Sequence, residues 1–158
     1  GNVENKNNRV ICGDVLSGTK IERDGYLGFY DTQITVIKEG DEQEFFGWAL
    51  PGFNKFSMSK SYFSWLFPKR KYEIDTNMRG EERAYVVTGQ YEKVLPMDIY
   101  PQQLIKAIMI EDIDLMEKLG LYEVGPEDLA LCEFVCTSKI EVQSIIRHGL
   151  DILRKENL

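Results

Sequence analysis

Two cysteines lie four residues apart in the run EDLALCEFVC, residues 127–136. On a helix, Cys132 and Cys136 would share one face about one turn apart, and their thiolates could supply two ligands to a zinc ion or an iron–sulfur cluster. Such sites normally take four protein ligands. The chain offers only one more cysteine, Cys12, and a single histidine, His148.

The same run also predicts a core segment. Its apolar stripe is formed by Leu129, Cys132, Val135 and Cys136. Free cysteine is among the most buried residue types and packs as a small hydrophobic side chain, so core packing is the favoured interpretation. Metal or iron–sulfur binding by Cys132 and Cys136, with Cys12, stays open as the alternative.

No other constellation points to catalysis. His148 precedes Gly149 and the chain has no second histidine to pair with it, which favours a surface or capping role. The chain contains no G-x-G-x-x-G, Walker A or H-E-x-x-H motif. We therefore expect no catalytic residue and no metal site, and we name no cofactor-binding residue.

A short basic cluster stands beside aromatic residues. It consists of Lys69, Arg70 and Lys71, which lie close in sequence to Trp65, Phe67 and Tyr72. An acidic partner or a membrane surface would suit this composition, and a solvated loop is the simpler interpretation.

Composition limits the class of protein. The 158 residues carry 26 acidic and 19 basic side chains, a net charge of −7, and this excess of acid disfavours nucleic-acid binding. No apolar run approaches the roughly 20 residues of a membrane helix. Three cysteines are too few for a secreted disulfide framework, so a cytoplasmic setting is expected. Residues 1–8 are polar and begin with Gly1, which predicts a disordered or tag-derived segment of a larger protein.

Residues 9–95 are expected to form a β-rich subdomain. The runs RVICGDVLSG and YLGFYDTQITVIKEG predict strands. In the second run, Ile34 and Val36 share a face with Tyr30 and Thr32, a half-buried pattern with Ile37 as the exception. A turn at Gly40 and Asp41 would lead to a return strand, EFFGWAL. The spacing from Met58 to Leu66 predicts a short helix, with a strand open as the alternative for the same residues, and a strand, AYVVTGQYEKVL, completes this half.

Residues 96–158 are expected to form a helical subdomain. Pro101 begins a helix with an apolar stripe of Leu104, Ile105, Ile108 and Met109, and Asp112 and Gly120 would bound a second helix. Pro126 starts a third helix, and Ser138 with Glu141 predicts a capping box for a fourth. Its apolar face contains Val142, Ile145, Ile146, Leu150 and Leu153. The fold class is therefore α+β, a β-rich half followed by about four helices.

Several stretches together resemble one family. They are NRVICGDVLSG, YLGFYDTQITVIKEG, EFFGWALPGFNKFS, YEKVLPMDIYP and LGLYEVGPEDLALCEFVCTSKIE. They are similar to the C-terminal part of the A subunit of the sodium-translocating NADH:quinone reductase, and the resemblance runs from Asn8 to the end of the chain. Gly125 and Pro126, ahead of EDLALC, are a small departure at a helix start.

The resemblance implies a peripheral subunit on the cytoplasmic side of the bacterial inner membrane, in a respiratory pump that couples NADH oxidation and ubiquinone reduction to sodium export. NADH, flavins, the iron–sulfur centre and ubiquinone would be bound through other subunits or regions. This fragment would hold no cofactor, would be inactive alone, and would serve as an accessory and docking module whose partners are the other subunits.

Three further expectations come from the resemblance. Related subunits of the Rnf complex and of complex I carry cysteine-ligated clusters in a C-terminal helical region, so the helices here would be a relic without the ligand set. VICGDVLSG would be the last strand of a β-grasp soluble-ligand-binding (SLBB) domain. Quinone would lie near aromatic residues such as Phe45, Phe46, Trp48 and Trp65, although core packing is the favoured role for these residues. A stand-alone soluble ligand-binding module is the remaining alternative.

Overall fold

The computed structural model describes residues 7–22, 24–40, 45–47, 49–57, 60–78, 80–85 and 89–156. The chain divides into two compact units, Gly1–Arg79 and Gly80–Leu158. The first unit holds a small sheet and the second holds the helices, so the predicted α+β class is confirmed.

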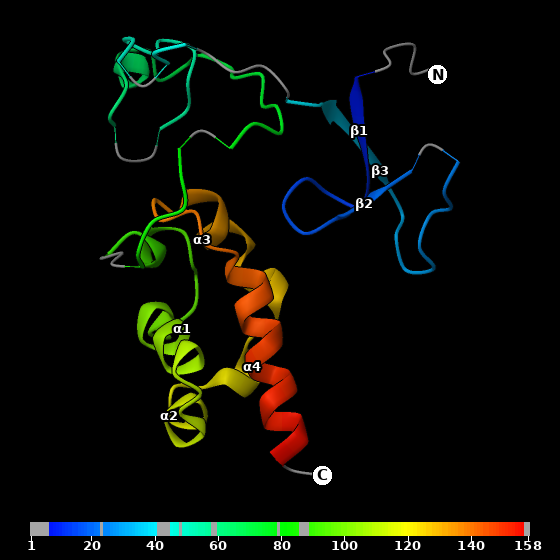
Figure 1. Cartoon of the computed structure of the whole chain (residues 1–158), viewed down its shortest axis with the longest axis vertical. Helices are drawn as coiled ribbons and strands as arrows, with labels where there is room; N and C mark the ends of the chain where they lie inside the picture. Colours follow the sequence, from blue (N-terminus) through cyan, green and yellow to red (C-terminus); the bar gives the residue numbers. More distant parts are fainter. Residues whose placement is uncertain are drawn as a thin grey trace. The chain divides into compact units, whose positions relative to one another are not determined.

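The sheet of the first unit has three antiparallel strands in the order β2-β1-β3 (Figure 1). Strand β1, Asn8–Cys12, is central, with β2, Thr19–Ile21, on one edge and β3, Ile34–Lys38, on the other. Val10 faces Ile21 across one ladder and Val36 across the other. β1 and β3 confirm the two predicted strand runs, while β2 was not predicted.

The more buried face of β3 is the opposite of the face that the sequence pattern indicated. Ile34 and Val36 are exposed, whereas Thr35 and Ile37 are partly buried. The Thr35 hydroxyl donates a hydrogen bond of 2.6 Å to the carbonyl oxygen of Gly13. This bond holds Thr35 on the covered face and leaves two β-branched apolar side chains in solvent.

The segment after the sheet lacks the predicted strand. Among the described residues of EFFGWAL, a turn replaces the strand, closed by the Ala49 N–H on the carbonyl oxygen of Phe46, whose φ is +55°. The expected helix is reduced to one 3-10 turn, η1, Phe63–Leu66. The predicted turn residue Asp41, the predicted helix start Met58, and Trp48 lie outside the described residues.

The last predicted strand, AYVVTGQYEKVL, is also wrong where the structure describes it. Tyr91–Lys93 forms a 3-10 turn, η2, and residues 86–88 lie outside the described residues. The carbonyl oxygen of Tyr91 accepts hydrogen bonds from the N–H groups of Val94 and Leu95. This turn allows the Tyr91 ring to pack in the core of the second unit, where it is fully buried.

The second unit contains four α-helices: α1, Pro101–Met109; α2, Ile113–Lys118; α3, Ala130–Val135; and α4, Val142–Glu156. Two 3-10 turns, η3 (Leu121–Glu123) and η4 (Pro126–Leu129), lie between α2 and α3. Helix α4 packs against α1 and α3 (Figure 1). None of the helices within the described ranges is long and apolar enough to cross a membrane.

Three predicted helix boundaries are confirmed, one of them Pro101 as the first residue of α1, and one is wrong. The Asp112 carboxylate accepts a 3.0 Å hydrogen bond from the Leu115 N–H at the start of α2, and Gly120 follows α2 with φ of +82°. Ser138 does not cap α4, because the helix begins only at Val142; the Ser138 hydroxyl instead donates to the carbonyl oxygen of Ala84. Instead, the Glu133 carboxylate of α3 accepts a hydrogen bond from the Gln143 N–H. This bond satisfies one of the backbone N–H groups in the first turn of α4, which have no partner within the helix.

The core of the second unit lies between α1, α3 and α4. On the predicted stripes, Met109 is exposed, while Ile145 and Leu150 are only partly buried. Gly149 lies where α4 approaches α1, and a Cβ there would come within 2.9 Å of Ile108. The fully buried side chains include Tyr91, Leu104, Ile105, Met116, Leu121, Leu129, Cys132, Cys136, Val142, Ile146 and Leu153.

Candidate functional site

The two cysteines of the EDLALCEFVC run lie inside the helical core. Cys132 and Cys136 are both fully buried, in the same cluster as Tyr91 and Leu129. The Tyr91 hydroxyl donates to the Cys136 sulfur at 3.1 Å. The Tyr91 ring stacks on the ring of Tyr85, with centroids 6.1 Å apart. The helix face therefore places the thiols against apolar and phenolic groups.

Burial opposes ionisation of Cys132, Tyr85 and Tyr91 in this cluster. It raises the pKa of the Cys132 thiol to about 11, with the negative charge of Glu92 as the next cause. It also raises the pKa values of Tyr85 and Tyr91, that of Tyr91 being raised further by its hydrogen bond to Cys136. Because the thiolate is both the nucleophile and the metal ligand, Cys132 is poorly suited to either task at neutral pH.

Cys12 belongs to the first unit, in a different setting. Its thiol donates to the Asp31 carboxylate at 2.9 Å, and its sulfur accepts the Gly28 N–H at 3.1 Å. The hydrogen bond to Asp31 raises the pKa of Cys12. Cys12 is also almost fully buried. These contacts fasten the loop of residues 28–31 to the end of β1.

His148 is a surface residue of α4. Its Nε2 lies 3.5 Å from a carboxylate oxygen of Glu111, and both side chains are well exposed. Within the described parts of the chain, no group of three or more histidine, cysteine, aspartate or glutamate side chains could hold a metal ion.

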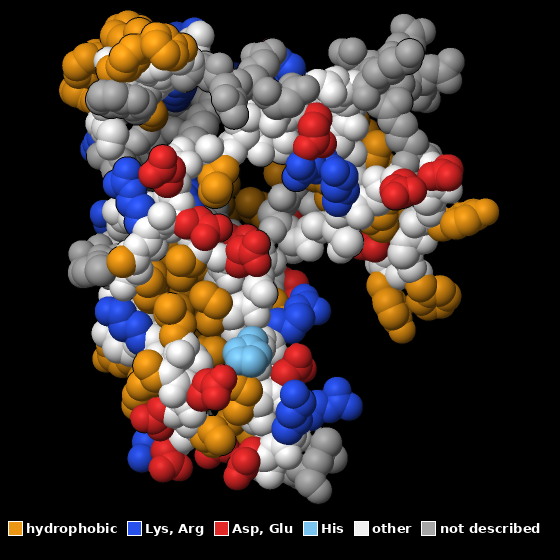
Figure 2. Space-filling view, in the orientation of Figure 1, with side chains coloured by type: hydrophobic (Ala, Val, Ile, Leu, Met, Phe, Trp, Pro, Cys, Tyr) orange, Lys and Arg blue, Asp and Glu red, His pale blue; other side chains and the backbone are white. Residues whose placement is uncertain are grey.

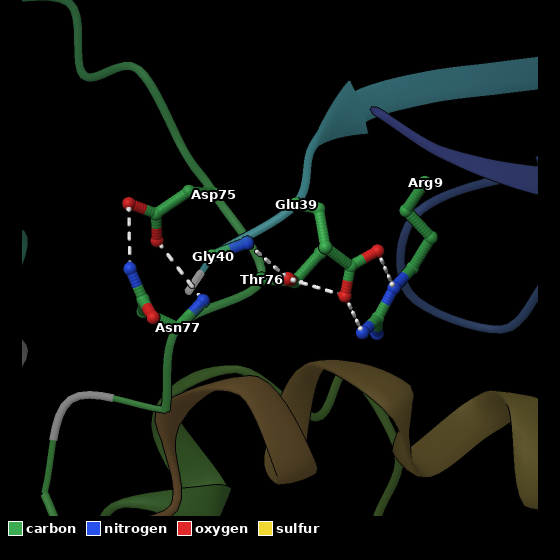
Figure 3. A network of polar contacts seen from close by, with 6 residues as sticks. All are labelled: Arg9, Glu39, Gly40, Asp75, Thr76 and Asn77. Atoms are coloured by element: carbon green, nitrogen blue, oxygen red, sulfur yellow. Dashed lines mark hydrogen bonds and ion pairs between the residues drawn. The ribbon is translucent and has the colours of Figure 1, made fainter. Parts of the chain in front are cut away.

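A second polar cluster lies where β3 ends in the first unit (Figure 3). Arg9 on β1 and Glu39 just after β3 form a two-bond ion pair, with Nε to Oε2 at 3.0 Å and Nη2 to Oε1. The Thr76 hydroxyl donates to Glu39 at 3.3 Å and accepts the Gly40 N–H at 2.7 Å. One carboxylate therefore joins the sheet to a segment 37 residues further along the chain.

Neighbouring contacts extend this attachment. The Thr76 N–H donates to the carbonyl oxygen of Lys38. Asp75 forms an isolated parallel bridge with Lys38, and its carboxylate accepts both the backbone and side-chain N–H groups of Asn77 (Figure 3). The hydrogen bonds from Arg9 hold the pKa of Glu39 below its ordinary value. We call this cluster the clamp, because it holds residues 75–77 against the end of β3. Its carboxylate, Glu39, is already paired with Arg9.

Replacing Glu39 by glutamine should reduce the acid sensitivity of the first unit. The lowered pKa means that Glu39 stabilises the fold above its unfolded pKa, near 4.5, and that this stabilisation is lost as pH falls through the lower folded pKa. Both tryptophans, Trp48 and Trp65, belong to this unit, so tryptophan fluorescence during urea unfolding reports on it. The urea midpoint of E39Q should be lower than wild type at pH 7 and should change less toward pH 3.

An exposed carboxylate of the same unit provides the control. Glu73→Gln removes an equal charge without touching the clamp, so its urea midpoint should follow the wild-type pH dependence. An acid slope in E39Q as steep as in wild type would contradict the role assigned to the Arg9 and Glu39 pair.

This clamp was not predicted from the sequence. The available signal was the position of Arg9 at the start of one strand and of Glu39 just past the end of another, which an antiparallel pairing brings together. Thr76 and Asn77 carried no such signal, because no strand was predicted near them.

The chain is of the α+β class, its three thiols are buried, and the Glu39 carboxylate is paired with Arg9. No family model matches the chain. A protein from Rhodopirellula baltica, named as the A subunit of the Na(+)-translocating NADH-quinone reductase, is 47% identical over 149 residues, which cover 94% of this chain and 33% of that protein. Relatives of the same name from Shewanella frigidimarina and Yersinia pestis are 45% and 40% identical.

The chain is therefore homologous, over nearly its whole length, to the C-terminal part of the A subunits of the Na(+)-translocating NADH-quinone reductase. The resemblance stated from its sequence is confirmed. The chain spans about a third of the length of these curated relatives.

Proposed function

We propose that this chain is the accessory and docking part of the A subunit in a respiratory sodium pump that couples NADH oxidation and quinone reduction to sodium export. The observation that carries the proposal is homology of 40–47% identity over at least 94% of the chain to proteins of that name. The partners are the remaining subunits of the pump, and the location is the cytoplasmic side of the bacterial inner membrane.

The state of the cysteines supports a role without electron transfer. Cys132 and Cys136 are packed in a helical core, and the pKa of Cys132 is raised to about 11 by burial. Cys12 is hydrogen-bonded to Asp31 within the other unit. In this proposal NADH, flavin and iron–sulfur chemistry belongs to other regions of the complex, and the isolated chain does not turn over substrate.

Quinone enters the proposal as a neighbour in the assembled pump. Phe45 and Phe46 are exposed and pack edge to face, with ring centroids 4.5 Å apart. Trp65 is half exposed. These rings are available to an apolar ligand or partner surface, which supports contact within the complex better than the core role favoured from the sequence.

Association with the other subunits tests the docking role. The tagged 158-residue chain should retain the detergent-solubilised remaining pump subunits of the same bacterium on an affinity resin. As a control, an unrelated acidic protein with the same tag should retain none. Failure to retain subunits that are shown to assemble with the full-length A subunit would overturn the proposal.

A further inference from the structure

The segment of residues 53–72 in the first unit has a composition unlike the rest of the chain. It carries five cationic side chains and no carboxylate, in a chain whose net charge is −7. The cationic residues are Lys55, Lys60, Lys69, Arg70 and Lys71. The same segment holds seven aromatic residues, Phe53, Phe56, Tyr62, Phe63, Trp65, Phe67 and Tyr72.

Backbone contacts fix the outward direction of the aromatic residues. The Phe63 N–H donates to the carbonyl oxygen of Pro51, and η1 begins there. Within η1 only Ser64 is buried, and its carbonyl oxygen accepts the Tyr72 hydroxyl at 3.4 Å and the Phe67 N–H at 3.0 Å. The 3-10 turn is therefore held in place through the buried Ser64, and its bulky side chains are exposed.

Those bulky side chains are about half exposed. Phe63, Trp65, Leu66 and Phe67 each keep 50–53% of their surface accessible, and Phe53 packs behind Phe63 and Phe67 with centroid distances near 6 Å. Figure 2 shows hydrophobic side chains gathered over this part of the first unit, at the upper left. We call residues 63–71 the aromatic–basic surface.

The aromatic–basic surface joins the apolar groups to the positive charge. An open hollow of about 450 Å³ is lined by Leu66, Phe67, Pro68, Lys69 and Arg70. Lys69, Arg70 and Lys71 are all exposed, and no carboxylate among the described residues forms an ion pair with them. Pro68 lies between the apolar 3-10 turn and the three cationic residues that follow it in the sequence.

We infer that the aromatic–basic surface docks on an anionic phospholipid membrane. Trp, Phe and Leu side chains can bury at the boundary between headgroups and acyl chains, and each Lys or Arg near an anionic leaflet adds attraction. A phospholipid surface accepts both groups at once, with headgroup phosphates over the cations and acyl carbons under the rings. The inference deepens the proposed function by naming what the first unit meets besides the other subunits.

Vesicle sedimentation tests this docking without any other pump subunit, so its failure is distinct from failure of the proposed association. The 158-residue chain should bind vesicles of phosphatidylglycerol and phosphatidylethanolamine more tightly than vesicles of phosphatidylcholine, and added salt should weaken binding. The triple variant K69Q/R70Q/K71Q should bind the anionic vesicles about 100-fold more weakly. In a W48F background, Trp65 fluorescence should shift to shorter wavelength on binding.

A charge-matched variant separates local docking from general attraction. R147Q/R154Q/K155Q removes three exposed cations from α4 and should bind as wild type does. Circular dichroism should show all variants folded. Absence of wild-type binding to the anionic vesicles, or equal losses in the two triple variants, would overturn the inference. If K69Q/R70Q/K71Q instead lost only the retention of pump subunits, the surface would be a protein interface and the lipid inference would be wrong.

Discussion

Replacing Ile146 by alanine should lower the free energy of unfolding of the helical unit by about 2–5 kcal/mol. Ile146 is fully buried on the face of α4 that packs into the core with Val142 and Leu153. Truncation removes apolar transfer energy and leaves a cavity that the neighbouring helices fill only in part. Urea unfolding followed by circular dichroism at 222 nm measures the effect, because the α-helices formed by the described residues all lie in this unit.

The same substitution at an exposed site provides the control. Ile110 follows α1 and keeps 71% of its surface accessible. Ile110→Ala should change the free energy of unfolding by no more than about 0.5 kcal/mol. Equal losses at Ile146 and Ile110 would contradict the packing of α4 described above.

The helical half could be predicted well because its signals are local. Proline at a helix start, the Asp112 cap, the glycine after α2 and the 3.6-residue periodicity of α4 each depend on a few adjacent residues. The N-terminus of α4 was assigned wrongly because its cap comes from Glu133 on another helix. A tertiary partner of that kind leaves no pattern within the segment it caps.

The β-rich half was harder because strand signals depend on neighbours. Aromatic and β-branched content predicted strands at EFFGWAL and around Tyr91, yet neither segment has a partner strand in the described chain. Tyr91 instead packs among helices. Similarly, alternation along β3 separated two faces correctly but could not decide which face is covered, since that depends on the Thr35 contact with Gly13.

Counting ligands in the sequence bore on the role of Cys132 and Cys136, and the structure adds how the two side chains are packed. Ligand counting alone made a four-ligand site improbable, but it could not show what the thiols contact. The structure adds an asymmetry that the sequence could not contain: Cys136 accepts a hydrogen bond from Tyr91, whereas no described residue donates to or accepts from Cys132. The two positions therefore respond differently to a change in polarity.

Serine should destabilise the helical unit more than alanine at Cys132, and less than alanine at Cys136. At Cys132, serine buries a hydroxyl without a partner and should cost about 1–3 kcal/mol of stability, more than alanine. At Cys136, serine can still accept the Tyr91 hydroxyl, whereas alanine leaves that hydroxyl unsatisfied and should cost about 1–3 kcal/mol. Urea unfolding followed at 222 nm gives the four values.

Turnover of the pump then separates a packing role from electron transfer. Each cysteine variant, built into the full-length A subunit and assembled with the other subunits, should keep the wild-type rate of quinone reduction per assembled complex. Fewer complexes should assemble in proportion to lost stability, since destabilised chains are removed before assembly. If Cys132→Ala and Cys136→Ser, the two milder changes, each abolished turnover in fully assembled complexes, the thiols would belong to the electron path and the core role would be wrong.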